Sequence, residues 1–193
     1  MITHIQGKLV EKNPTDVVID CNGVGYFLNI SLHTFSHLPS TENVKLYTQL
    51  LVREDSHTLF GFSSIEERAI FNLLISVSGV GASTARTMLS SLSPELIRDA
   101  IVSEDILTIQ SVKGIGSKTA QRVILDLKDK ILKVYGASPN SSMSSNTNRN
   151  EALSALETLG FARKQAEKVC DAFLKKQPQA TLEEIIKEAL KNL

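Results

Sequence analysis

Residues 77–86 read VSGVGASTAR, and residues 112–121, thirty-five positions later, read VKGIGSKTAQ. Both copies continue into apolar residues at helical spacing, namely Met88, Leu89 and Leu92 after the first copy and Val123, Ile124 and Leu127 after the second. Apolar residues three and four positions apart form one face of an amphipathic helix. Each copy therefore predicts a helix, a tight Gly-apolar-Gly turn and a second helix.

Such a turn has a physical consequence for the helix that follows it. Glycine lets the backbone bend sharply, and small residues such as Ala82, Ser83 and Ser117 leave the first amides of the next helix uncovered. Those amides have no partner inside the helix and lie at its positive end, so they can hold a phosphate. The two copies resemble the helix-hairpin-helix motif of DNA-binding proteins that do not read sequence. The alternative, an ordinary helix C-cap, explains one copy better than two matched copies.

The charge composition limits what kind of nucleic-acid binder this can be. The chain carries 21 Lys and Arg against 21 Asp and Glu, so its formal net charge is zero. Residues 1–63 hold four basic and six acidic side chains, a net charge of −2, and residues 64–135 hold nine and eight, a net charge of +1. A purely electrostatic DNA binder would be basic. The turn geometry, rather than the bulk charge, therefore points to DNA.

The two cysteines and the apolar runs exclude other classes of protein. Cys21 and Cys170 lie far apart and outside any Cys/His cluster, which favours two reduced core thiols over a disulfide or a metal site. No cofactor motif stands out. We find no leader pattern and no run of membrane-spanning length, so we expect a cytoplasmic protein that does not enter a membrane.

The first 63 residues predict a β-structure. Short runs rich in β-branched and aromatic residues alternate with turn signals, at residues 5–10, 17–20, 26–30, 44–50 and 58–62. Five short strands of this kind predict a small closed barrel of the OB type. Gly7 and Gly61, which fall inside strands, indicate bulges or sharp bends.

A turn with two adjacent carboxylates joins the last two predicted strands. It consists of Arg53, Glu54, Asp55 and Ser56. Asp and Ser are common in turns, so the residues by themselves favour a solvated hairpin tip.

Residues 64–135 predict an all-α domain that contains both Gly turns. Ser64 and Glu67 form a capping box, Ser93 and Pro94 start another helix, and residues 103–105 start a third. Residues 136–150 are mostly Ser and Asn with almost nothing to bury, which predicts a flexible linker. Residues 151–193 resume helical periodicity and predict a three-helix, UBA-like bundle, too small to be very stable alone. The predicted fold class is thus α+β with several domains.

In this order the parts resemble the RuvA family, the bacterial Holliday-junction-binding subunits of a branch-migration complex. The resemblance covers the whole chain. It rests on the two Gly turns and on residues 23–26 (GVGY), 52–55 (VRED), 59–62 (LFGF), 152–156 (ALSAL) and 159–161 (LGF). The Arg-Glu-Asp tip and the Phe-Gly-Phe strand are the most diagnostic.

The resemblance implies a function in DNA recombination and repair. Proteins of this family are tetramers that hold a four-way junction open and nearly square, with one tetramer or two on the DNA. Glu54 and Asp55 match the acidic pin at the centre, whose charge repels phosphates, and Arg53 would steady the pin or touch DNA. The DNA-binding positions implied are Gly79, Gly81, Ser83, Thr84, Gly114, Gly116, Ser117, Lys118, Thr119 and Arg122.

One of these positions departs from the family pattern. Many members have Lys where this chain has Ser83, so the first motif would bind with amides and a hydroxyl only. Lys118 matches a basic family position, and Arg122 either adds a contact or is simply a solvated helix residue. We expect a gentler salt dependence than in a Lys-bearing member, because each lost charged contact lowers the slope by about one unit.

The resemblance also implies protein partners. The C-terminal bundle would contact the hexameric ATPase RuvB, and the endonuclease RuvC can share the junction. Leu156, Leu159, Phe161 and Ala189 are candidates for the RuvB surface, with the alternative that they form only the core of the bundle.

Two other functions compete with this interpretation. Helix-hairpin-helix motifs occur in DNA enzymes, but Asp126 lies within the second motif's own helix, the wrong place for a glycosylase acid, and the adjacent Glu54 and Asp55 would diverge rather than share a metal. With no phosphate-binding lysine motif either, we expect a non-catalytic subunit, and the resemblance implies that the ATPase is RuvB. A DNA scaffold without junction preference is the second alternative, and the acidic tip, which would weaken duplex binding, speaks against it.

Overall fold

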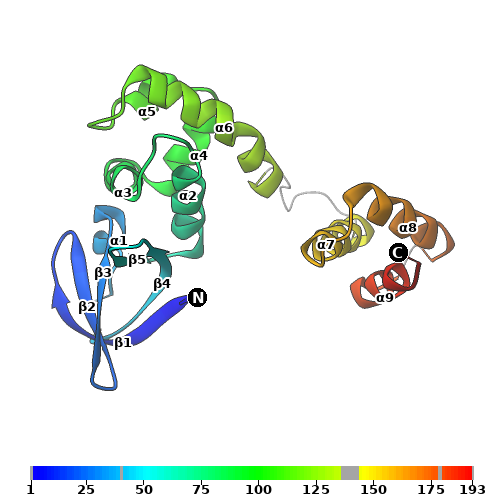
Figure 1. Ribbon diagram of the computed structural model, residues 1–193, viewed down its shortest axis with the longest axis horizontal. Coiled ribbons are helices and arrows are strands. Elements are labelled where there is room, and N and C mark those ends of the chain that lie inside the picture. The colour runs from blue at the N-terminus through cyan, green and yellow to red at the C-terminus, as the bar shows by residue number, and fades with distance from the viewer. Residues whose placement is uncertain (1, 40, 136–143, 178–179, 193) are drawn as a thin grey trace. The chain divides into compact units, whose positions relative to one another are not determined.

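The computed structural model describes residues 2–39, 41–135, 144–177 and 180–192 (Figure 1). The chain forms two compact units, Met1–Ala137 and Ser138–Leu193, which are described separately here. Among the described residues, the first unit contains a β-barrel with one short helix between two of its strands, followed by five helices, and the second unit contains three helices.

Five strands form the barrel, which confirms the predicted OB-like class. They are β1 (His4–Lys12), β2 (Asp16–Cys21), β3 (Val24–Asn29), β4 (Asn43–Val52) and β5 (His57–Phe62). The barrel closes in the order β1-β2-β3-β5-β4, with β3 and β5 as its parallel pair. Alternate residues such as Val17, Ile19 and Leu28 point inward and are fully buried. A short helix that the sequence pattern did not predict, α1 (Leu32–Ser36), joins β3 to β4.

Gly7 serves a different purpose from the predicted bulge. The register shift between β1 and β2 lies between Leu9 and Glu11. Gly7 is instead the point where β1 comes closest to its neighbour, because a Cβ built there would lie 2.1 Å from the backbone oxygen of Asp20. Gly61 is crowded more mildly, with the side chains of Leu28 and Leu46 at 3.1 Å. Both glycines are thus explained by close packing.

The helices that follow the barrel are α2 (Ile65–Ile75), α3 (Ala82–Ser91), α4 (Pro94–Val102), α5 (Ile106–Gln110) and α6 (Ser117–Tyr135). Of these five, α2, α4 and α5 start at the predicted capping residues. The Ser64 hydroxyl accepts a hydrogen bond from the amide of Glu67 at 3.0 Å, and Ser93 caps α4 in the same way. Residues 103–105 were predicted to start a helix, and Asp105 is the N-cap of α5.

The barrel and the helices of the first unit share a core at the end of β5. The rings of Phe60 and Phe62 pack on Phe71 of α2, with ring centroids 5.0 and 4.9 Å apart. These residues belong to one buried apolar cluster that continues through the helices. The limits of the domains stay predictions. The strand β5, which follows the acidic tip, packs directly on the helical part.

A buried carboxylate strengthens this joint. Glu67 is fully buried, and its side chain accepts hydrogen bonds from Thr34 at 2.6 Å and from the amide and hydroxyl of Ser63 at 3.1 and 3.0 Å, as well as from Ser31. Because a buried charge is tolerated only when its lone pairs are satisfied, this network holds α1, β5 and α2 in one arrangement. The capping box predicted for Ser64 and Glu67 did not indicate this network.

The second unit is the predicted bundle of α7 (Ser144–Thr158), α8 (Arg163–Lys176) and α9 (Leu182–Asn192). Its core includes Leu153, Cys170 and Ile185. Of the predicted linker, residues 136–143 lie outside the described residues, and residues 144–150 differ from the prediction because they are helical. In this part of α7, Arg149 forms a two-pronged ion pair with Asp171 of α8, at 2.6 and 3.0 Å. Composition could not reveal this contact.

Candidate nucleic-acid interface

The two Gly turns have the same hydrogen bonds at equivalent positions. Three backbone hydrogen bonds of the first turn recur in the second. Their donors are the amide at the end of the first helix, the amide of the apolar residue between the glycines, and an amide of the following helix. The paired bonds are Val77 to Leu74 (3.1 Å) and Val112 to Ile109 (3.4 Å), Val80 to Val77 (3.0 Å) and Ile115 to Val112 (3.1 Å), and Ala85 to Gly81 and Ala120 to Gly116 (both 2.9 Å). The sequence repeat is therefore a structural repeat of two helix-hairpin-helix units.

The apolar residue of each turn anchors the loop. Val80 and Ile115 are each only 5% exposed and belong to the shared core. With the middle of the turn held inward, the glycines on either side stay at the surface. Each hairpin thus has exposed glycine backbone on both sides of a buried apolar anchor.

The glycines keep the backbone of these loops accessible. Gly79 and Gly114 have φ of +93° and +91°, a conformation that residues with a Cβ rarely adopt. A Cβ built on Gly81 or Gly116 would meet no protein atom within 4 Å. Gly81, the N-cap of α3, makes no side-chain capping bond, so the first amides of α3 remain available to an anion.

The other predicted contact residues surround these loops. Ser83, Ser117 and Lys118 are exposed, while Thr84 and Thr119 are half-buried. Arg122 is exposed as well, and its Nη1 donates a hydrogen bond to the carbonyl oxygen of Ser78 at 3.3 Å. The sequence did not indicate this bond, which links the second motif to the loop of the first.

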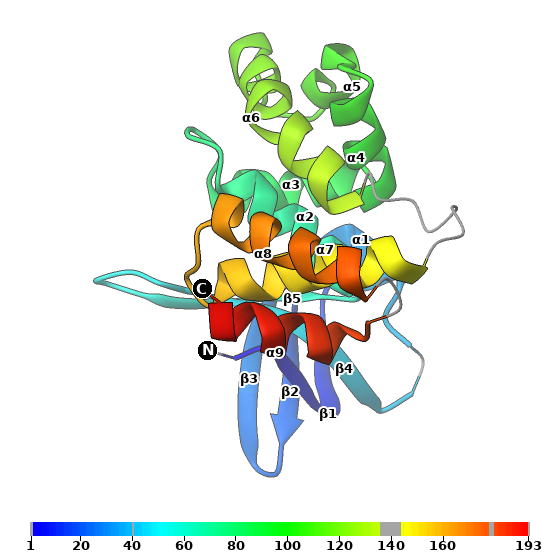
Figure 2. The same cartoon turned by 90° about the vertical axis from the view of Figure 1, so that its right-hand side faces the viewer.

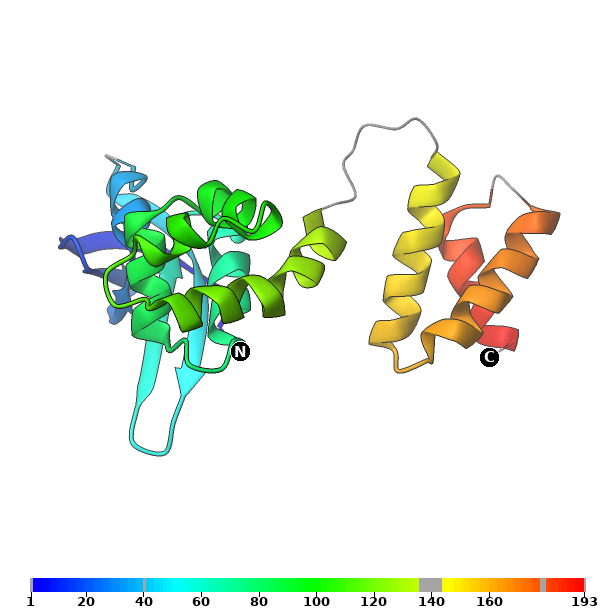
Figure 3. The same ribbon diagram turned by 90° about the horizontal axis from the view of Figure 1, so that it is seen from above.

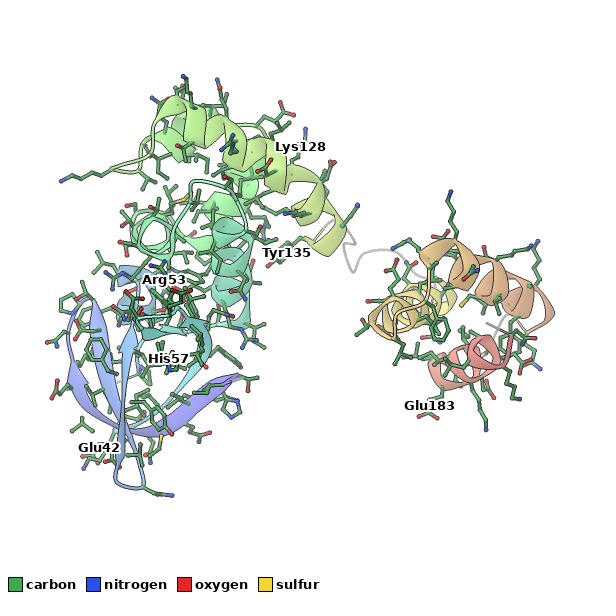
Figure 4. The ribbon with its side chains drawn as sticks, in the orientation of Figure 1. Glu42, Arg53, His57, Lys128, Tyr135 and Glu183 are labelled. Carbon is green, nitrogen blue, oxygen red and sulfur yellow. The ribbon has the colours of Figure 1, made fainter. Side chains whose placement is uncertain are left out.

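The predicted acidic tip forms the end of the β4–β5 hairpin. The amide of Arg53 donates to the carbonyl of Ser56 at 2.8 Å and closes the turn, with Glu54 and Asp55 exposed at its end. In Figures 2 and 3 this hairpin extends away from the barrel, and the loop between α2 and α3 projects from the same side of the unit. Figure 4 labels Arg53 and His57, which flank the tip. A ligand lying along this side would meet both carboxylates and open amides.

Three family models match the chain in the order of its parts. The RuvA N terminal domain matches residues 1–61, the SAM-like helix-hairpin-helix tandem matches residues 71–129, and the RuvA C-terminal domain matches residues 147–193. The chain belongs to the RuvA family.

Full-length relatives agree with this assignment to the RuvA family. The chain is 65% identical over 193 residues to the Holliday junction branch migration complex subunit RuvA of Christiangramia forsetii, and 64% identical to that of Flavobacterium psychrophilum, with all of each chain covered. The protein of the same name from Bacteroides thetaiotaomicron is 49% identical over 201 residues, again with both chains fully covered. The resemblance drawn from the sequence motifs is confirmed.

Two basic residues near the RuvA-family hairpins were not singled out from the sequence. Lys113 is exposed in the second turn, and its position next to Gly114 in the repeat could have identified it as a candidate contact residue. Arg86 of α3 turns toward the barrel, where it donates to the Asn29 side chain at 2.9 Å and to the carbonyl of Thr15 at 3.3 Å. The pKa of the nearby Asp16 is lowered, mainly by hydrogen bonds from Asn13 and Thr15 and to a small extent by Arg86.

The C-terminal contact residues predicted from RuvA-family resemblance divide into two groups. Leu156 and Ala189 are fully buried in the core of the bundle, so a partner cannot touch them without unfolding it. Leu159 is 60% exposed and Phe161 is half-buried. The burial of Leu156 and Ala189 therefore favours the alternative that they form only the core of the bundle.

Two further features of the described residues concern metal binding and membranes. Within the described part of the chain, no three His, Cys, Asp or Glu side chains gather in a way that could hold a metal ion. None of the described helices has both the length and the apolar character needed to cross a bilayer.

Proposed function

We propose that this protein is the subunit of a branch-migration complex that binds four-way DNA junctions. The observation that carries the proposal is the pair of matched hairpins with open amides on a unit that also projects an acidic tip. Relatives that align over the whole chain are named as Holliday junction branch migration complex subunits, which supports the same function.

In this proposal the hairpins bind the DNA arms through phosphates. The amides of Gly79, Gly81, Gly114 and Gly116 contact backbone oxygens, aided by Ser83, Thr84, Ser117, Lys118, Thr119 and Arg122. Such contacts position DNA without reading bases. The protein therefore recognises the form of the DNA and not its sequence.

The acidic tip supplies the preference for a junction. Four subunits around the crossover bring four copies of Glu54 and Asp55 to the point where strands exchange, with Arg53 at the base of each tip. Carboxylates repel phosphates, so a continuous duplex across the centre is disfavoured while an open crossover is tolerated. The tetramer, or a pair of tetramers face to face, is part of the proposal.

The chain itself has a non-catalytic role in this proposal, in the cytoplasm. ATP hydrolysis belongs to the RuvB hexamer, which the C-terminal unit recruits, and the endonuclease RuvC shares the junction. Of the predicted RuvB contacts, Leu159 and Phe161 have the exposure that a docking residue needs.

A gel-shift titration in magnesium tests the proposal. It compares a four-way junction with a linear duplex of the same arm sequence, using the unmodified protein and a Glu54→Gln/Asp55→Asn double variant. We expect the unmodified protein to prefer the junction strongly and the double variant to bind duplex more tightly, with reduced selectivity.

A matched variant controls for the loss of negative charge. Glu42→Gln removes a carboxylate from an exposed barrel position away from the tip (Figure 4) and should leave selectivity unchanged. Equal affinity of the unmodified protein for both DNAs would leave only a general DNA scaffold. Metal-dependent cleavage by the pure protein would contradict the non-catalytic role.

A further inference from the structure

The two hairpins of the repeat carry different chemistry. Three basic residues of the second motif stand where the first motif has hydroxyl residues, thirty-five positions earlier. The pairs are Lys113 with Ser78, Lys118 with Ser83, and Arg122 with Thr87. The turns have the same backbone hydrogen bonds, but at these three positions only the second motif has basic side chains.

The basic residue of the first motif is engaged elsewhere. Arg86 is held by the side chain of Asn29 and the carbonyl of Thr15, both in the barrel. Its role is to join α3 to β3 and to the turn before β2. A phosphate at the first hairpin would therefore meet amides and the Ser83 hydroxyl, without a cation from its own motif.

Arg122 lies where it can fill this gap. It belongs to α6, yet its guanidinium reaches the α2–α3 loop and donates to the carbonyl of Ser78, the residue just before Gly79. That bond uses one of five guanidinium N–H groups. The remaining donors can face an anion at the loop, and guanidinium is well suited to phosphate because its donors form a fixed fork.

We propose that Arg122 supplies, from the second motif, the positive charge of the first hairpin. It takes the place of a lysine at position 83 and fixes the spacing of the two loops through Ser78. The inference rests on the proposed binding of DNA by both hairpins and gives that function a specific charged residue. The phosphate of one hairpin is then held by side chains from two motifs.

Salt-dependent binding to a four-way junction tests this assignment. Arg122→Gln should lower the slope of log affinity against log salt by roughly one unit for each engaged subunit. Lys133→Gln removes a charge about 16 Å further along the same helix and should leave the slope unchanged. Ser83→Lys, added to Arg122→Gln, should restore the slope, because it returns a cation to the first hairpin.

A second added lysine separates local charge from net charge. Ser91→Lys, about 12 Å from position 83 on α3, should not restore the slope of the Arg122→Gln protein. If Ser83→Lys also fails to restore it, or if Arg122→Gln keeps the slope of the unmodified protein, the inference is wrong. Thermal melts of every variant identify any loss through unfolding, which Ser83→Lys could not repair.

The same experiment distinguishes this inference from the proposed function. A lower slope for Lys118→Gln with no change for Arg122→Gln would overturn the inference and leave DNA binding by the second hairpin intact. Failure of the unmodified protein to bind either junction or duplex would overturn both.

Discussion

Gly79 and Gly114 adopt the same left-handed backbone, with φ of +93° and +91°, although they lie thirty-five residues apart. The glycine two positions after each of them is different, because no φ in the left-handed region is found at Gly81 or Gly116, and a Cβ there would meet open space. The fold therefore requires the first glycine of each turn. The fold does not require the second glycine, which in the proposed function lets DNA approach the backbone closely.

Gly81→Ser should separate stability from DNA binding. Serine is a good N-cap, so its hydroxyl would cover the first amides of α3 and raise the free energy of unfolding by a few tenths of a kcal/mol. The same hydroxyl would compete with phosphate and weaken DNA binding about tenfold. Urea unfolding and junction titration check the two effects. Ser93→Gly, which removes the cap of α4, is the matched control and should lower stability slightly without changing DNA affinity.

Gly7→Ala should destabilise the barrel. The added Cβ would lie 2.1 Å from the backbone oxygen of Asp20, so β1 and β2 must separate. We expect a loss of about 1–3 kcal/mol or more in the free energy of unfolding, measured with urea. Gly25→Ala is the control, because its Cβ would contact only a Val18 methyl at 3.5 Å. Equal midpoints for the two variants would contradict the close approach.

Glu67→Ala should weaken the joint between barrel and helices. The buried donors of Ser31 and Thr34 and the half-buried donors of Ser63 would lose their acceptor, at a cost of at least about 2 kcal/mol in unfolding free energy. The same joint holds β5, the strand that follows the acidic tip. Selectivity for junctions over duplex should therefore decline as well. Chemical denaturation measures the first effect and gel shifts the second. Glu42→Ala breaks only the exposed pair with Lys8 and should change neither.

The C-terminal unit should lose stability in acid through Asp171. Its hydrogen bonds with Arg149 are the main reason why the pKa of this carboxyl lies below the ordinary value of 3.8. A lowered pKa means that the stabilisation is complete above the unfolded-state value and is lost as pH falls through the folded-state value. Hydrogen exchange of the α8 amides in the full chain should therefore accelerate as pH falls below 3.8, beyond the intrinsic change.

Asp171→Asn gives the control for this acid effect. The variant should exchange faster at neutral pH, and its residual pH dependence should be smaller than that of the unmodified protein. Glu151→Gln, at an exposed position on α7, should leave the profile unchanged. An identical acid response in the Asp171→Asn protein would show that the ion pair is not responsible.

Local features of the site were predictable from the residues. The Gly turns, the tip at Arg53–Glu54–Asp55 and the caps Ser64 and Ser93 depend on neighbours in sequence, so their patterns are readable without a fold. The exposure of Leu159 and the burial of Leu156 were not predictable, because both are apolar at helical spacing and only the packing partner decides which one faces inward.

Periodicity, turn chemistry and motif order were enough to predict the barrel, the repeated hairpins, the C-terminal bundle and the family that they resemble. Which side chains meet across long sequence separations became known only from the folded chain. Glu67 of α2 bonds Thr34 of α1, Arg122 reaches Ser78, and Arg149 of α7 pairs with Asp171 of α8. Such contacts depend on packing between elements, and no local pattern of residue types encodes them.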